Sequence, residues 1–131
     1  MRISRRVPAA AMCVAASIGS ADAALTEDSF LLRNTGDLVE LCSAEQPDPM
    51  YTAASNFCHG FAVGVFRVLQ EENRASRSNP LFCLPNPAPT RNQAIAGLMQ
   101  WAKANPSQMA KPAADSIAAF LSHQYKCARG R

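Results

Sequence analysis

Hydrophobic residues recur at steps of three and four along much of the chain, which is the spacing of one face of an α-helix. The longest series begins at Tyr51 and predicts a central helix. Its expected inward positions are Ala54, Cys58, Phe61, Ala62, Val65, Val68 and Leu69. No segment alternates between apolar and polar residues, so no β-strand is predicted. The pattern therefore predicts an all-α fold.

Three shorter segments complete a small four-helix domain. The first helix lies at 38–42, and polar groups at 35–37 can cap it. The third follows Thr90, a good N-cap, and stops at Asn105-Pro106. The fourth runs from about Ser107 or Pro112 to His123. The expected inward residues are Ile95, Leu98, Met99 and Ala102 in the third helix, and Ala114, Ile117, Ala118, Leu121 and Tyr125 in the fourth.

Between the second and third helices, the stretch Asn73 to Pro89 is rich in proline and polar residues. A long loop inside a compact domain is often functional. We therefore take Arg74, Arg77 and Asn79 as candidate contacts for a partner protein. Charged loops are also commonly plain solvated surface, and the sequence leaves both interpretations open.

The first residues are typical of a secretory signal peptide. Arg2, Arg5 and Arg6 precede an apolar run over 7–18, and Ala21-Asp22-Ala23 fits a cleavage site. The apolar run is too short to cross a bilayer, which takes about 20 residues. The chain thus divides into a signal peptide, 1–23, and a single periplasmic domain, 24–131, with no membrane anchor. Lead-in residues 24–33 are expected to pack on the domain through Phe30, Leu31 and Leu32.

We predict that Ala24 is the first residue of the exported protein. The intact mass of protein purified from the periplasm measures this directly. A mass that retains residues 1–23, or that carries lipid on Cys13, would contradict it.

The charge of the mature chain is close to balanced, with 10 basic and 9 acidic residues. A nucleic-acid-binding domain would show a clustered basic face, so no nucleic-acid partner is predicted.

Four cysteines remain after cleavage: Cys42, Cys58, Cys83 and Cys127. An even number in a small exported domain indicates two disulfides, although four cysteines allow three pairings. Cys42 ends the first helix and Cys58 lies early in the second, so the turn at 47–49 brings them together. The prediction is therefore Cys42–Cys58 and Cys83–Cys127.

The neighbouring residues Cys58 and His59 could also indicate a haem, metal or catalytic site. Haem attachment needs C-x-x-C-H, and Ser55 stands where the first cysteine would be. Zinc needs clustered ligands, whereas the only histidines are His59 and His123 and no two cysteines lie within four residues. Neighbours on a helix diverge by about 100°, which separates the two side chains, although His123 could approach Cys58 from another helix. No cofactor is predicted, and no enzyme.

Gly60 and Gly64 form a G-x-x-x-G pattern, which in membrane helices marks close packing between helices. Because Arg67, Glu71 and Glu72 follow directly, we expect it to mark close contact with another helix of the same domain.

Several short motifs occur together in this chain. They are Thr-Gly-Asp-Leu with Leu-Cys (35–42), Cys-His-Gly-Phe with Gly (58–64), Phe-Cys-Leu-Pro (82–85), Thr-Arg-Asn-Gln (90–93), Asn-Pro (105–106) and Tyr-Lys-Cys (125–127). This combination resembles the Rap/Tai immunity protein family over roughly 35–127. Lys126 departs from the family pattern, which commonly has proline before the last cysteine.

The resemblance implies an exported helical protein, frequently a homodimer, that plugs the active site of a peptidoglycan amidase delivered by type VI secretion. All matched residues are cysteines, glycines, caps or core positions, so it implies no contact residue. The alternative is a small periplasmic chaperone of the acid-stress type. That mechanism needs many carboxylates whose protonation loosens the fold, and nine acids against ten bases make it less natural.

Overall fold

The computed structural model describes residues 24–76 and 78–128, and the predicted signal peptide lies outside them. Within these ranges the order is η1 (Glu27–Leu31), α1 (Thr35–Cys42), α2 (Tyr51–Ala75), α3 (Arg91–Ala104), η2 (Pro106–Gln108) and α4 (Ala113–Gln124), where η is a 3-10 helix. No strand occurs in the described part of the chain. The predicted all-α, four-helix fold is confirmed.

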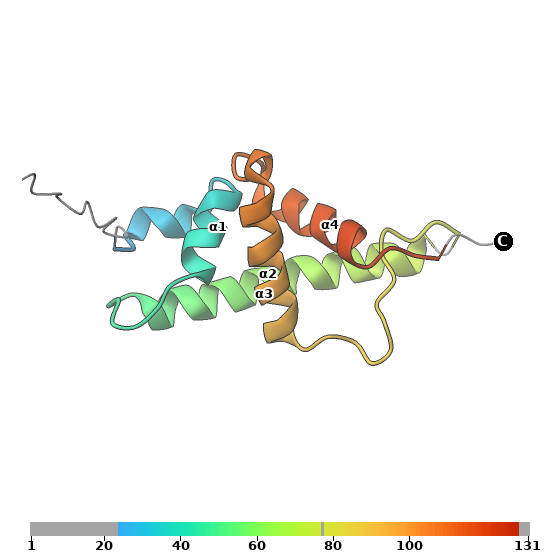
Figure 1. Ribbon diagram of the computed structural model, residues 1–131, viewed down its shortest axis with the longest axis horizontal. Helices are drawn as coiled ribbons and strands as arrows, with labels where there is room; N and C mark the ends of the chain where they lie inside the picture. The colour runs from blue at the N-terminus through green and yellow to red at the C-terminus, as the bar shows by residue number, and fades with distance from the viewer. Residues whose placement is uncertain (1–23, 77, 129–131) are drawn as a thin grey trace, which may run out of the picture.

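Helix α2 runs along the long axis of the molecule, and the other helices lie against it (Figure 1). Its 25 residues make it far longer than α1, α3 or α4. The buried positions of α2 are Ala54, Cys58 and Ala62, which are small and lie one turn apart. Small side chains let neighbouring helices approach closely, and α1, α3 and α4 all contact α2.

Val68 does not face the core as predicted, because 61% of it is exposed. Positions four residues apart drift around a helix by about 40° per step, so the buried series that starts at Ala54 moves toward Phe66. Phe66 packs against Phe82 of the following loop, with 5.9 Å between ring centroids. The C-terminal half of α2 therefore buries the Phe66 side and leaves Val68 in solvent.

The core lies where α3 and α4 cross α2. Its buried members include Leu38 of α1, Leu98 and Met99 of α3, and Ile117 and Phe120 of α4. The inward side of α4 is rotated relative to the prediction: Ala114 is exposed, and the buried residues are Ala113, Ser116, Ile117, Phe120 and Leu121. The hydrophobic pattern could not assign Ser116 to this face because serine is polar.

A buried polar cluster explains why Ser116 is inside. The Thr35 hydroxyl lies 2.8 Å from Ser116 Oγ and 2.9 Å from the Lys111 carbonyl oxygen, and Ser116 Oγ donates to Gln108 Oε1 at 3.2 Å. The backbone N–H groups of Thr35 and Gly36 donate to the carbonyls of Lys111 and Met109. The start of α1 is thus bonded to the η2–α4 connection.

This arrangement corrects the predicted cap of α1. Asn34 is the N-cap, and its side chain accepts from the Asp37 N–H at 3.1 Å. Thr35 belongs to the core instead, with 1% of its surface exposed. At α3 the prediction holds: Thr90 and Gln93 form a reciprocal capping box.

Two of the three apolar side chains of the lead-in, Phe30 and Leu32, pack on the domain as predicted, and Leu32 lies against the hydrophobic core. Phe30 meets Phe57 edge-on at 5.6 Å, and Phe57 stacks on Phe61 at 6.4 Å. Ser29 is buried and donates to Glu40 Oε2 at 3.1 Å. Leu31, which was also expected to pack, is 65% exposed.

The G-x-x-x-G prediction was wrong. A Cβ atom added to Gly60 or Gly64 would meet nothing within 4 Å, so none of the described helices packs there. The glycine in close contact is Gly97 of α3, where a Cβ would lie 3.3 Å from the Phe120 ring. Positions 60, 64 and 68 therefore form an open side of α2. None of the described helices, α2 included, has the length and apolar character to span a bilayer.

Candidate functional site

Two disulfides join the four cysteines as predicted. Cys42 is bonded to Cys58 with a Cα–Cα distance of 5.2 Å, and Cys83 is bonded to Cys127 with 4.9 Å. The first ties the end of α1 to α2, and the second ties the α2–α3 loop to the segment that follows α4. Because Cys58 is bonded to Cys42, it is not a free thiol next to His59.

The α2–α3 loop, 76–89, is held to the helices at its middle. Asn73 accepts from the Leu81 N–H through Oδ1 and donates to the Phe82 carbonyl through Nδ2, both at 2.7 Å. The Cys83 N–H donates to the Tyr125 carbonyl at 2.8 Å. Phe82 is only 4% exposed. The side chain of Asn73 thus fastens the loop to the end of α2, while the second disulfide fastens it to the end of α4.

Two of the three predicted contact residues, Arg74 and Asn79, lie at this end of the molecule. Arg74 is the last basic residue of α2 and is exposed, and its guanidinium donates to Glu71 Oε1 at 2.6 Å. Asn79 is exposed, and its N–H donates to the Ser76 carbonyl at 2.9 Å. Arg77 lies outside the described residues. Leu81, which the sequence analysis did not single out, is 44% exposed beside them.

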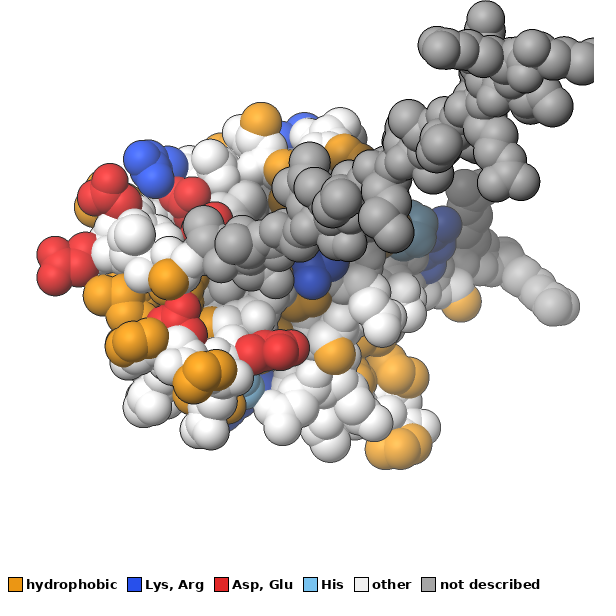
Figure 2. Space-filling model, turned by 60° about the vertical axis from the view of Figure 1, so that its left-hand side comes forward, with side chains coloured by type: hydrophobic (Ala, Val, Ile, Leu, Met, Phe, Trp, Pro, Cys, Tyr) orange, Lys and Arg blue, Asp and Glu red, His pale blue; other side chains and the backbone are white. Residues whose placement is uncertain are grey.

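Acidic and basic residues are unevenly distributed along the sequence. Residues 24–50 hold six acidic residues and one basic residue, whereas 51–131 hold three acidic and nine basic residues. Figure 2 brings the η1–α1 end forward and shows acidic side chains spread over it. The sequence from α2 onward therefore carries the excess of basic residues. The summed charge of the chain conceals this uneven distribution, because the two parts of the sequence nearly cancel.

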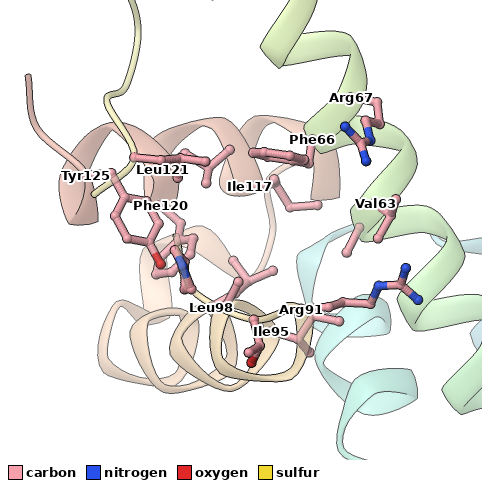
Figure 3. A pocket seen from close by; sticks show the side chains of 15 residues that line it. Val63, Phe66, Arg67, Arg91, Ile95, Leu98, Ile117, Phe120, Leu121 and Tyr125 are labelled. Carbon is pink, nitrogen blue, oxygen red and sulfur yellow. The ribbon is translucent and has the colours of Figure 1, made fainter. Parts of the chain in front are cut away.

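Beside the loop, a cavity of about 290 Å³ lies between α2, α3 and α4 (Figure 3). Loop residues Leu84 and Pro89 form part of its wall. Two basic residues, Arg67 of α2 and Arg91 of α3, lie among otherwise uncharged lining residues. The sequence analysis missed this cavity, because its lining comes from four segments that are distant in sequence.

His123, the histidine that could approach Cys58 from another helix, has an aromatic neighbour. His123 lies against Trp101, with 6.3 Å between ring centroids. Among residues 24–76 and 78–128, no group of three or more His, Cys, Asp or Glu side chains could hold a metal ion.

The fold and the loop define a class of small helical proteins with two disulfides, one of which holds a surface loop in place. The chain matches the Rap1a immunity proteins over residues 34–127 and belongs to this family. The match runs from the N-cap of α1 to the last cysteine, so it includes both disulfides and the loop. The resemblance to the Rap/Tai family is thereby confirmed. No curated protein and no solved structure matches the chain.

We predict that the two disulfides make separable contributions. Replacing Cys83 and Cys127 by alanine should lower the free energy of unfolding by about 4 kcal/mol, because that bond closes a ring over a separation of 44 residues. Replacing Cys42 and Cys58 should cost about 3 kcal/mol for a separation of 16. Urea unfolding measures both values.

Hydrogen exchange then separates the two bonds in space. Amide exchange at 81–84 should rise when Cys83 and Cys127 are replaced and should stay nearly unchanged when Cys42 and Cys58 are replaced. Peptide mapping without reduction provides the direct check, and recovery of a free Cys58 thiol would refute the pairing.

Proposed function

We propose that this chain is a periplasmic immunity protein that binds and inhibits a peptidoglycan amidase delivered by type VI secretion. Membership of the Rap1a immunity protein family carries the proposal. The amidase as target comes from the Rap/Tai resemblance of the motifs. Two disulfides support the location, since such bonds form and persist in oxidising compartments such as the periplasm.

In this proposal the loop at 76–89, with the neighbouring end of α2, is the contact surface. A loop that is already ordered loses little conformational freedom when it binds, so more of the contact energy contributes to affinity. Asn73 and the Cys83–Cys127 bond supply that order. Leu81 offers an apolar contact, and Arg74, Arg77 and Asn79 offer polar ones.

Inhibition requires no chemistry from this chain, because filling the cleft of the amidase excludes its substrate. The excess of basic residues in the sequence from 51 onward, Arg74 and Arg77 among them, favours an acidic surface around that cleft. Complementary charge of this kind speeds association and selects the partner.

We predict that Arg74→Glu combined with Arg77→Glu weakens binding to the amidase encoded by a neighbouring gene by at least about tenfold, because both charges then oppose an acidic partner surface. Calorimetric titration measures the affinity, and peptidoglycan cleavage is followed in parallel. His59→Ala, a change on α2 away from the loop, is the control and should bind almost as the parent does.

Two results would count against the proposal in different ways. An unchanged affinity in the double variant would remove the loop as the contact surface. Failure of the parent protein to bind any such amidase, together with suppression of aggregation at low pH, would favour the acid-stress chaperone.

The proposal includes a homodimer, as the family resemblance implies. The open side of α2 offers a place for a second copy. Gly60 and Gly64 would let a second backbone approach closely, and Val68 adds exposed apolar surface one turn further on.

We predict that Gly64→Lys converts the dimer to a monomer without reducing the stability of the fold, because a Cβ atom at this position meets nothing within 4 Å in the described chain. Thr52→Lys, at another exposed position of α2, is the matched control and should stay dimeric. Sedimentation velocity gives the mass of each variant. A parent protein that sediments as a monomer at all concentrations would exclude the dimer.

A further inference from the structure

The cavity between α2, α3 and α4 reaches the centre of the hydrophobic core. Its inner wall is formed by four side chains that are each 3% or 4% exposed: Leu98, Ile117, Phe120 and Leu121. Ala62, Phe66 and Ile95 continue the apolar wall toward the surface. An apolar recess of this depth removes most of an inserted hydrocarbon group from water, which is the main source of affinity in ligand sites.

The size of the cavity favours an alkyl chain over one inserted side chain. An engineered cavity of about 150 Å³ lined by Leu, Ile and Phe binds benzene. The present volume of about 290 Å³ is nearly twice as large. A single side chain of a partner would therefore leave much of it unfilled, and its walls would lose dispersion contacts. A two-chain lipid would not fit, because the volume is near the lower limit of ligand pockets, about 300 Å³.

The charged residues around the cavity favour a ligand with a negative charge. Arg67 and Arg91 are exposed and line it, and no acidic residue does. Figure 3 shows both guanidinium groups on the side of the cavity where Val63 lies, away from Tyr125. In the part of the chain that the structure describes, neither pairs with a carboxylate. Arg67 Nη1 donates to Gln70 Oε1 at 3.0 Å, which leaves its other N–H groups free to bind a ligand.

We infer that this cavity binds an amphipathic anion with one alkyl chain of medium length. The chain lies along Phe66, Ile95 and the buried inner wall. The carboxylate or phosphate head lies between Arg67 and Arg91, whose planar guanidinium groups match both anions. This binding site goes beyond the proposed inhibition of an amidase and does not depend on it.

The test is a titration of the purified exported protein with four ten-carbon probes, each below its micelle concentration. The probes are decanoate, decyl phosphate, decanol and decyltrimethylammonium, and calorimetry with amide NMR shifts reports binding. We expect at least one anion to bind at least about tenfold more tightly than decanol, and the cation to bind more weakly than decanol. The tighter of the two anions identifies the head group. Binding of neither anion, or equal binding of decanol, would overturn the inference.

Substitutions then locate the site. Arg67→Glu with Arg91→Glu should weaken binding of the anion at least about tenfold and leave decanol unaffected, because only the head group is repelled. Lys103→Glu, an exposed charge reversal on α3 outside the cavity, is the matched control. An unchanged affinity for the anion in the double variant would overturn the assignment.

A substitution that fills the cavity provides a second, independent test of the site. Ala94→Phe places a ring in the cavity and should abolish binding of all probes, whereas Ala96→Phe lies outside the lining and should not. Circular dichroism checks that each variant is folded, and the arginine variants decide the question if Ala94→Phe is not. Amidase binding is measured separately, so either proposal can fail without the other.

Discussion

The unequal lengths of the helices are the constraint on which the rest of this structure depends. The 25 residues of α2 extend beyond the reach of the 8 residues of α1, the 14 of α3 and the 12 of α4. An apolar residue such as Phe66, in the C-terminal half of α2, must still be covered. The loop does this: Phe82 packs on Phe66, and the Cys83–Cys127 bond, together with Asn73, holds the loop in place.

The same constraint produces the features that bear on function. Because the loop must return from the far end of α2 to the start of α3, it passes over the junction of three helices without filling it. Leu84 and Pro89 thereby become part of the wall of the cavity. The exposed remainder of the loop, with Leu81 and Asn79, is presented on a fixed support. The same arrangement therefore anchors the α2–α3 loop and exposes its outer residues for binding.

Buried polar groups fix the opposite side of the domain. Thr35, Ser116 and Gln108 form a hydrogen-bonded cluster that joins the start of α1 to the start of α4. In a buried setting such groups are costly unless every one has a partner, and no buried side-chain nitrogen or oxygen in the described residues lacks one. The cluster therefore specifies how α1 and α4 meet, which apolar packing alone would leave less well defined.

The sequence by itself determined the properties that depend on near neighbours along the chain. Helical periodicity, the capping box at Thr90 and the proline-rich loop are local, and the pairing of four cysteines followed from the order of the helices. The tertiary structure alone decided what depends on distant segments. The hydroxyl of Ser116 can be buried because it bonds to Thr35, which is 81 residues away in sequence, and to Gln108. Gly60 and Gly64 have no close neighbours because no element of the described chain reaches that side of α2. Gly97 is the glycine in close contact with another helix, because the Phe120 ring of α4 packs against it. The cavity and its two arginines belong to the same category, since a void is defined by the elements that surround it and by no single stretch of sequence.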